Sequence, residues 1–420
     1  MTTGRYVIIV DPLSTGQEYA PAFRSAGLRP VAVLTPRQPI GPMAGTWHRE
    51  NFEDVHVFDG DERWLATLLA QYDPLCVIPG CETGVELADA LTELLLPGTG
   101  NVPGLSRARR DKWQMAQALA RAGVPHLRQF CSADADEIAR WITESGMTGC
   151  PLVVKPPKSM ATDEVHLVAP GEDFRPYVGR ILRRRNVGGM PNTSVLVQEH
   201  AVGTEYIVDS YSVDSRHGLV DVCRYTKSRR GDRIGLYNRV EFLAQDAPEV
   251  AELWAYVQRV LDAVGIRNGC GHAEIMMTAD GLRLIEIGAR PAGGGHQFIT
   301  EAATGDNHIH RTVAHRVRGE FTPGYELCQH LSAVFISSPA AGRWLNAEIF
   351  DEVDALPTYW RRHFPFGTGD VVRATEDLFT HLAWVVLTGP DADAVEADVR
   401  RLFEIERLIE IAPLLEGVSA

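Results

Sequence analysis

Two glutamates, Glu274 and Glu286, lie in neighbouring stretches of alternating sequence joined by a short polar segment. In a strand every second side chain lies on one face, so His272 shares a face with Glu274, and Leu284 shares one with Glu286. A three-residue loop at 279–281, with glycine last, pairs the two glutamates directly. Such carboxylates repel unless a cation lies between them, and hard oxygens suit Mg²⁺ that bridges nucleotide phosphates. A hairpin with acids on its solvent face is the structural alternative.

A basic residue lies at or just after the end of each of two predicted strands. Arg290 follows Glu286 on the same face and precedes a glycine-rich turn. Lys155 ends the buried strand predicted at Leu152–Lys155, and the next residues are small or carry hydroxyls. This pattern is typical of a flap that covers phosphates, although it is not a Walker A loop.

A third basic group opens a helix predicted at 107–122 and includes Arg109, Arg110 and Lys112. Basic residues are unfavourable at a helix N-terminus because the helix dipole is positive there. We therefore expect these side chains to face something anionic. A solvated basic face is the alternative.

Composition excludes several classes of protein. With 420 residues, 45% hydrophobic and 23% charged, the chain is typical of a globular protein of about three domains. A formal net charge of −14 argues against a broad nucleic-acid-binding surface and leaves a local basic pocket open. Seven cysteines without a CxxC pair indicate a reduced, cytoplasmic protein without structural zinc. The sequence shows neither a signal peptide nor an apolar run of about 18 residues, so we expect no membrane contact.

The N-terminal residues, 1–106, predict an open parallel α/β domain. A buried strand at Tyr6–Val10 begins a βαβ unit, and a strand near 75–78 leads into a helix at Val85–Leu95. No GxGxxG follows the first strand, which argues against a dinucleotide site. Glu82, in the loop at a strand end, is a candidate for holding a substrate amine. A helix-capping acid is the alternative.

The rest of the chain predicts two further domains, at 107–322 and 323–420. The central one combines strands with a helix at 246–264 that leads to the glutamate hairpin. The last is a small α+β domain whose final helix, at 391–402, Asp391 or Asp393 can cap. Its aromatic residues, such as Trp344, are expected in the core.

Six motifs in order resemble the ATP-grasp superfamily, and within it the L-amino-acid ligases of the dapdiamide-synthetase and bacilysin-ligase kind. They are ARRDKWQM, VVKPPKSMATDEV, VQEHAVGTEYIVD, RYTKSRR, GIRNGCGHAEIMMTADG and LIEIGARPAGG. Each motif is weak alone, but six in family order span about the whole chain. The resemblance implies an ATP-grasp fold, with a Rossmann-like domain first, a nucleotide flap near 152–168, a hinge at 198–201 and a C-terminal domain that closes the active site.

The resemblance also implies residue roles. Glu274 and Glu286 are expected to hold Mg²⁺, or Mn²⁺ in its place, and Arg290 to contact the transferring phosphate. The residues expected to bind ATP are Lys112 and Lys155 on the phosphates, Ser159 and Thr162 in the flap, Gln198, Glu199, His200 and Ala201 at the base, and Glu205 on the ribose.

Two catalytic candidates carry alternatives. Lys227 is expected on the γ-phosphate or on a substrate carboxylate, or else is a surface lysine in a basic turn. His272 is a candidate general base for the amine, although a histidine beside a strand acid is more often a structural hydrogen-bond partner. Gly293 and Gly294 leave room for a sizeable acyl substrate.

Two positions depart from the pattern of similar ligases. Ala161 stands where their flap usually has glycine, which restricts the backbone and could slow flap closure. Gly288 stands where many relatives carry an asparagine metal ligand, so water is expected to replace one ligand.

The chemistry implied is ATP-dependent ligation of a carboxylate and an amine through an acyl phosphate, releasing ADP and phosphate, in small-peptide or specialised-metabolite biosynthesis. The substrates are small molecules, and a homodimer is usual among such ligases. Two alternatives remain: a related enzyme that activates bicarbonate or formate, and a nucleotide-binding module without turnover. Amino-acid-dependent ADP release distinguishes them.

Overall fold

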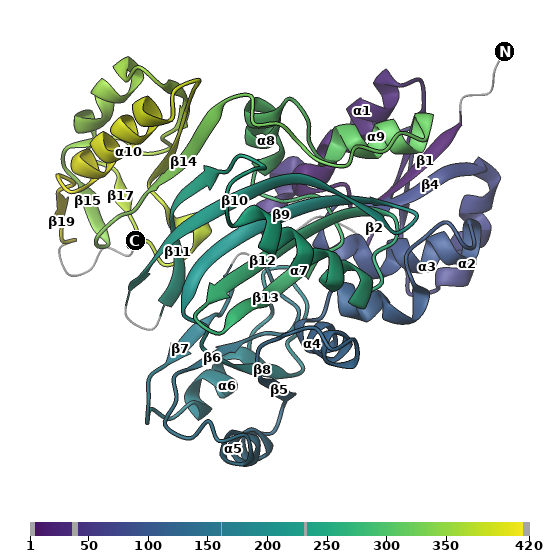
Figure 1. Cartoon of the computed structure of the whole chain (residues 1–420), viewed down its shortest axis with the longest axis horizontal. Helices are drawn as coiled ribbons and strands as arrows, with labels where there is room; N and C mark the ends of the chain where they lie inside the picture. Colours follow the sequence, from purple (N-terminus) through teal and green to yellow (C-terminus); the bar gives the residue numbers. More distant parts are fainter. Residues whose placement is uncertain (1–4, 36–40, 161, 231–232, 415–420) are drawn as a thin grey trace.

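The structure is a computed structural model that describes residues 5–35, 41–160, 162–230 and 233–414. Figure 1 shows an N-terminal α/β unit at one end, a large central sheet and a C-terminal unit at the other end. Ala161, and with it the expectation about flap closure, lies outside the described residues. Among the described helices, none combines the length and apolar character that crossing a bilayer requires.

The N-terminal unit is a parallel sheet of order β3-β2-β1-β4, built from β1 (Tyr6–Val10), β2 (Arg29–Leu34), β3 (Asp54–Val57) and β4 (Pro74–Pro79). Alternate residues of β1 pack on opposite faces: Val7 and Ile9 pack with α1 (Tyr19–Ser25), and Ile8 and Val10 with α2 (Glu62–Leu69) and α3 (Val85–Leu95). Because both faces are covered, β1, β4 and most of β2 are apolar, whereas the edge strand β3 carries Asp54 and His56. The predicted α/β opening is confirmed.

The central sheet has strand order β13-β12-β9-β10-β11-β7-β6-β8-β5 in the described chain. Its strands are β5 (Gln129–Ser132), β6 (Leu152–Lys155), β7 (His166–Val168), β8 (Val195–Glu199), β9 (Gly203–Val213), β10 (Arg216–Arg230), β11 (Arg233–Phe242), β12 (Gly269–Thr278) and β13 (Gly281–Gly288).

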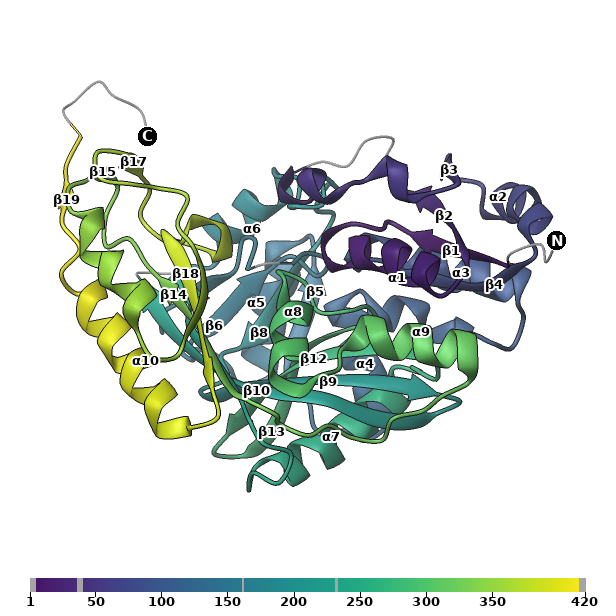
Figure 2. The same ribbon diagram turned by 90° about the horizontal axis from the view of Figure 1, so that it is seen from above.

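Two separate hydrophobic cores support the two halves of this sheet. One joins β6 and β8 to α5 (Ala135–Glu144) and α6 (Arg175–Leu182), the lower lobe in Figure 1. The other joins β9, β12 and β13 to α4 (Lys112–Arg121) and α7 (Val250–Ala263). The halves therefore form two walls with a space between them. Helices α8 (His296–Thr304) and α9 (His308–Arg318) follow the hairpin, and α9 lies beside α1 (Figure 2).

The C-terminal unit continues the central sheet, because β14 (His330–Ile336) pairs with β11. β18 (Ala383–Gly389) follows β14, and β16 (Tyr359–His363) follows β18. A small sheet adds β15 (Gly342–Trp344), β17 (Val371–Val372) and β19 (Ile411–Ala412). Asp391, rather than Asp393, caps α10 (Ala392–Glu406) by accepting a hydrogen bond from the Asp393 amide at 3.0 Å. Trp344 is fully buried in the core.

The predicted helix at 107–122 begins later than expected. A 3₁₀ helix, Pro103–Arg109, comes first, and α4 begins at Lys112. Asp111 caps α4, since its carboxylate accepts from the amides of Trp113 at 2.9 Å and Gln114 at 3.1 Å. Arg109 and Arg110 therefore precede the helix, and the dipole argument does not apply to them.

Arg109 has a structural role. Its side chain is fully buried and donates to Asp89 of α3 at 2.8 Å, to the Val264 carbonyl at 2.9 Å and to the Val102 carbonyl at 3.1 Å. These contacts join the N-terminal unit to the end of α7. The sequence prediction of an anionic partner holds for Arg109, but the anion is a residue of this chain.

We expect Arg109→Ala to destabilise the protein by about 3–5 kcal/mol, because it removes the buried cation paired with Asp89 and its hydrogen bond to the Val264 carbonyl. Denaturant unfolding would measure the loss. Arg107→Ala, a neighbouring exposed arginine, serves as the control and should change the free energy of unfolding by less than about 0.5 kcal/mol. Equal stability of both variants would show that the Arg109 contacts contribute little.

Candidate active site

The hairpin β12–β13 pairs Glu274 with Glu286, as predicted, but by a different route. Thr278 pairs with Gly281, so the loop holds only residues 279 and 280, and Gly281 has a φ of +98°. The register then shifts by one residue between Ile275 and Glu274. The predicted three-residue loop is wrong, and a β-bulge restores the glutamate pair.

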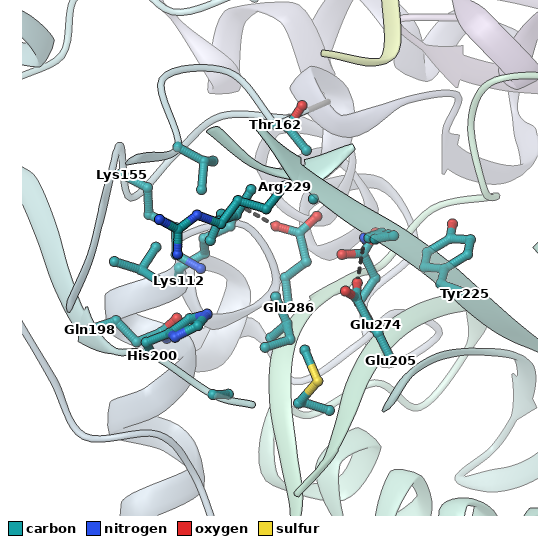
Figure 3. Close-up of a pocket in the computed structure, with 18 of the residues that line it drawn as sticks. Lys112, Lys155, Thr162, Gln198, His200, Glu205, Tyr225, Arg229, Glu274 and Glu286 are labelled. Carbon is teal, nitrogen blue, oxygen red and sulfur yellow. Dashed lines mark hydrogen bonds and ion pairs between the residues drawn. The ribbon is translucent and has the colours of Figure 1, made fainter. Parts of the chain in front are cut away.

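A cavity of about 400 Å³ lies between the two halves of the central sheet (Figure 3). The predicted site residues that line it are Lys112, Lys155, Ser159, Thr162, Gln198, His200, Ala201, Glu205, Lys227, Glu274 and Glu286. They come from α4, β6, the following flap, β8, the β8–β9 connection, β9, β10, β12 and β13. Figure 3 shows the carboxylates of Glu205, Glu274 and Glu286 facing the same space.

Two lysines approach Glu286, Lys112 from the start of α4 and Lys155 from the end of β6. Lys112 Nζ lies 2.5 Å from Glu286 Oε2 and donates to the Ser159 carbonyl at 3.1 Å. Lys155 is 5% exposed, and burial, together with the charge of Lys112, lowers the pKa of Lys155 to about 8. A buried ammonium beside another cation is poised for an anionic ligand.

The glutamate pair has the electrostatics of a cation site. Burial, and the carboxylates of Glu286 and Glu205, raise the pKa of Glu274. Burial also disfavours the charged form of Glu286, but Lys112 and Lys155 outweigh burial and lower the pKa of Glu286. Directly paired carboxylate oxygens that face a cavity fit Mg²⁺, which prefers hard oxygen ligands and retains water in its remaining positions.

Strand β8 directs neighbouring side chains to opposite sides. Gln198 lines the cavity and donates to Gln129. Glu199 instead accepts hydrogen bonds from the Arg128 amide at 2.8 Å and from Arg128 Nε at 2.7 Å. The structure therefore places the Glu199 carboxylate against Arg128 and outside the cavity lining, because adjacent strand residues point to opposite faces.

The flap after β6 is held by its own polar groups. Ser159 Oγ donates to Asp163 at 2.6 Å, and Asp163 also accepts from the Val187 amide at 3.0 Å. Thr162 lines the cavity with a φ of +61°. Lys158 Nζ lies 3.0 Å from both carboxylate oxygens of Glu86 on α3, so the flap contacts the N-terminal unit.

Lys227 belongs to β10 and is largely buried, so the alternative of a surface lysine is wrong. Its Nζ donates to Glu205 at 2.6 Å and lies 4.4 Å from the ring centroids of Tyr225 and Tyr237. Burial opposes its charge, but Glu205 outweighs burial and raises the pKa of Lys227. Sequence reasoning missed Tyr225, although it shares a strand face with Lys227.

Arg290 and Glu82 pair across 208 residues of sequence: Arg290 Nε donates to Glu82 Oε2 at 2.7 Å. Glu82 lies at the start of a 3₁₀ turn after β4. Its carboxylate pairs with the guanidinium of Arg290 rather than with a helix amide. Burial by itself would raise the pKa of Glu82. The positive charges of Arg290 and Arg110 have the larger effect, so the pKa of Glu82 is lowered overall. Neither Glu82 nor Arg290 lines the 400 Å³ cavity.

The remaining two groups also lie outside that lining. His272 is buried, and its Nδ1 lies 2.6 Å from Asp209 Oδ1. This is the structural hydrogen bond considered as an alternative. Gly293 and Gly294 lie between β13 and α8, where a Cβ on Gly294 would meet no atom of the described residues within 4 Å.

Comparisons with known proteins agree on the class. Residues 148–300 match the ATP-grasp domain. Dapdiamide A synthase of Enterobacter agglomerans is 28% identical over 410 residues, which cover 95% of each chain. Phosphoribosylamine–glycine ligase of Methanothermobacter thermautotrophicus is 27% identical over 260 residues, 53% of this chain and 57% of that one.

Solved structures share the fold. An L-amino acid ligase from Bacillus licheniformis superposes with a TM-score of 0.74 at 16% identity, covering 99% of this chain and 100% of that one. N5-carboxyaminoimidazole synthetase from Staphylococcus aureus, complexed with ADP, gives 0.64 at 14% identity, covering 97% and 99%. Residues 148–300 thus match the ATP-grasp domain, and the chain shares the fold of these solved structures, which confirms the predicted fold class.

Proposed function

We propose that this protein is an ATP-dependent carboxylate–amine ligase that forms an amide bond through an acyl phosphate. The observation that carries the proposal is the cavity wall where paired Glu274 and Glu286 face Lys112 and Lys155. This set suits a nucleoside triphosphate. The lysines can bind the phosphate oxygens, and the glutamates can bind a cation that is held by the phosphates. The similarity to dapdiamide A synthase over 95% of both chains supports an amino-acid-like substrate.

The residues take distinct roles in the proposal. Lys112, Lys155 and the flap residues Ser159 and Thr162 bind the phosphates. Gln198, His200 and Ala201 contact the base, and Glu205 the ribose, with Lys227 held beside it. Glu274 and Glu286 would hold Mg²⁺, or Mn²⁺, whose charge would neutralise the phosphate oxygens when bound. Arg290 and Glu82 face the substrates, with space beside Gly293 and Gly294.

The reaction follows from the weakness of a carboxylate as an acyl donor. One carboxylate oxygen attacks the γ-phosphorus, and the bond from that phosphorus to ADP breaks. The amine then attacks the acyl carbon, phosphate leaves with the original carboxylate oxygen, and the amine loses a proton. Little covalent work is left to the protein, so positioning and charge neutralisation by the lysines and Arg290 dominate.

Substrates are identified by a pairwise screen of carboxylates and amines for phosphate release, read by product mass. Amine-dependent release that is indifferent to bicarbonate and formate is expected. Release that depends on bicarbonate instead would favour a carboxylase.

We propose domains at 1–106, 107–322 and 323–420, and light scattering would test whether the enzyme is a homodimer.

Oxygen tracing tests the acyl phosphate. With an ¹⁸O-labelled carboxylate substrate, its amine and ATP, we expect singly labelled phosphate and unlabelled ADP, because the attacking oxygen leaves with phosphorus. An enzyme that adenylates its substrate would release AMP carrying the label. Mass spectrometry of the released phosphate and nucleotide decides between them, and labelled AMP would contradict the proposal.

A further inference from the structure

Two aspartates, Asp209 and Asp221, lie opposite each other on the neighbouring strands β9 and β10. Both side chains are fully buried. Like charges in direct cross-strand pairs destabilise a sheet, and a carboxylate is costly to bury unless it is paired or binds a metal. The pair therefore indicates that positive charge is bound close to it.

Each aspartate has one well-bonded oxygen and one that is poorly bonded. His272 Nδ1 lies 2.6 Å from Asp209 Oδ1, and Thr300 Oγ1 donates to Asp221 Oδ2 at 3.0 Å. Asp209 Oδ2 has no hydrogen-bond partner among the described residues. Asp221 Oδ1 accepts from the Cys223 thiol, a weak donor, at 3.6 Å. One oxygen of each carboxylate is thus oriented by a hydrogen bond, and the other can bind a cation.

The ring of His308 lies near the unpartnered oxygen but does not donate to it. Its Nδ1 is 3.6 Å from Asp209 Oδ2 and 3.2 Å from Gln297 Nε2. The Gln297 amide is oriented by its oxygen, which accepts from the His308 backbone amide at 2.7 Å. Gln297 Nε2 therefore donates to Nδ1, which then carries no proton for Asp209.

A buried imidazole and a buried thiol lie beside these two oxygens. His296, the first residue of α8, has its Nε2 3.4 Å from Asp221 Oδ1 and 3.7 Å from Asp209 Oδ2. One nitrogen carries at most one proton, so it cannot serve both acids, and both distances are long for a hydrogen bond. Cys223 shares a face of β10 with Asp221. Its Sγ, Asp221 Oδ1 and His296 Nε2 lie within 4.8 Å of one another.

The spacing of these atoms suits a tetrahedral zinc ion. Zinc bonds of about 2.0–2.1 Å to nitrogen and oxygen and about 2.3 Å to sulfur place neighbouring ligands about 3.3 Å apart, or about 3.6 Å where one is sulfur. The observed separations are 3.4 and 3.7 Å between nitrogen and oxygen and 3.6 Å between sulfur and oxygen. The ion occupies the space between its ligand atoms, so the site requires no separate cavity.

We propose that one Zn²⁺ ion is bound by four residues: Asp209, Asp221, Cys223 and His296. The ion joins α8 to β9 and β10, and its charge offsets the two buried aspartates. The Cys223 thiol passes its proton to solvent when sulfur binds the metal. Hydrogen bonds to the other carboxylate oxygens orient the ligands, as the outer partners of metal sites do. The sequence argued against structural zinc because it has no CxxC pair, but these ligands come from three separate elements.

The proposed zinc site is separate from the proposed magnesium site. None of its four ligands is among the residues that line the 400 Å³ cavity. Glu274 and Glu286 offer only oxygen, which suits Mg²⁺, whereas thiolate and imidazole favour Zn²⁺. Zinc that remains after dialysis against excess Mg²⁺ is therefore expected at the buried site.

Metal content of the full-length protein tests the proposal. The protein is expressed in zinc-supplemented medium, dialysed against excess Mg²⁺ and measured by plasma mass spectrometry. Wild type should hold about one zinc ion per chain, and Glu286→Gln should hold the same amount. Asp209→Asn and Cys223→Ser should each hold at least about tenfold less. Cys76→Ser, which changes a buried thiol of β4, is the control and should retain zinc.

Two measurements on the wild-type protein keep the test decisive if the variants do not fold. Protein loaded with Co²⁺ in place of Zn²⁺ should show the near-ultraviolet charge-transfer band of a cobalt–thiolate bond and the strong visible bands of tetrahedral cobalt. A chelator should lower the Tm of the zinc-loaded protein by at least about 5 °C, because a buried metal contributes to folding. Added Zn²⁺ should restore the Tm.

Three outcomes would overturn the zinc site, and each leaves the proposed ligase function standing. The first is wild-type protein that holds less than about a tenth of a zinc ion per chain. The second is zinc that is lost in Glu286→Gln but retained in Cys223→Ser, which would place the ion in the nucleotide cavity. The third is cobalt-loaded wild type without a thiolate band, which would show that Cys223 does not bind the metal.

Discussion

Glu286→Gln should reduce turnover at least about 1,000-fold while the protein stays folded. The substitution keeps the shape of the side chain but removes the charge that holds Lys112 at 2.5 Å and that would bind the phosphate-linked metal. A preorganised charge at a reacting phosphoryl group contributes several kcal/mol, which corresponds to this loss. Steady-state ADP release measures it, and circular dichroism checks the fold.

A control on the same hairpin makes this result specific. Asp280→Asn changes an exposed acid in the β12–β13 turn, and should leave turnover within about twofold of wild type. Partial recovery of Glu286→Gln at high Mg²⁺ or Mn²⁺ concentration would indicate that metal affinity was lost. Near-normal turnover of Glu286→Gln at ordinary Mg²⁺ concentration would remove the metal assignment.

The hairpin also shows how far sequence patterns reach. Alternation predicted that Glu274 and Glu286 share a face, and the structure pairs them. The loop length was wrong, because the two-residue turn and the bulge that follows it compensate each other. Alternation is a property of each strand and can be read locally. A bulge depends on how one strand fits another, so the sequence of either strand does not disclose it.

Contacts between distant segments were beyond prediction for the same reason. Arg290 and Glu82 were each chosen from their local setting, but their pairing across 208 residues depends on the packing of two units. Arg110 was expected at the N-terminus of a helix. Asp111 caps α4, so the helix begins after Arg110. That its terminal nitrogens have no acceptor among the described residues becomes visible only once the neighbouring carbonyls have been placed.

The continuation of the central sheet into the C-terminal unit is another feature of this kind. The sequence predicted a small α+β domain at 323–420, and the structure has β14 and β18 there. It could not predict that β14 pairs with β11, because strand order follows from long-range packing. This pairing attaches the C-terminal unit to the wall that carries Tyr237 and Lys227, so movement of that unit would act directly on the cavity.

Lys155 is the residue for which burial makes a pH-dependent prediction. Burial and Lys112 lower its pKa from about 10.5 to about 8, so the free protein loses this cation as the pH rises through 8. Bound phosphate stabilises the ammonium and raises the pKa of Lys155 again. ATP affinity should therefore be full below pH 8 and should fall above it, by at most about tenfold per pH unit, with proton uptake on binding.

Substitutions at Lys155 test this directly. Lys155→Ala should weaken ATP binding and turnover together, by about 100-fold, because a point charge on phosphate acts in both ground and transition states. Lys155→Arg keeps a charge at every pH used, so whatever its absolute affinity, the fall above pH 8 should disappear. Calorimetric titration with ATP between pH 6.5 and 9.5 measures both. Unchanged ATP affinity in Lys155→Ala, or the same pH dependence in Lys155→Arg, would show that the buried lysine does not bind the phosphates.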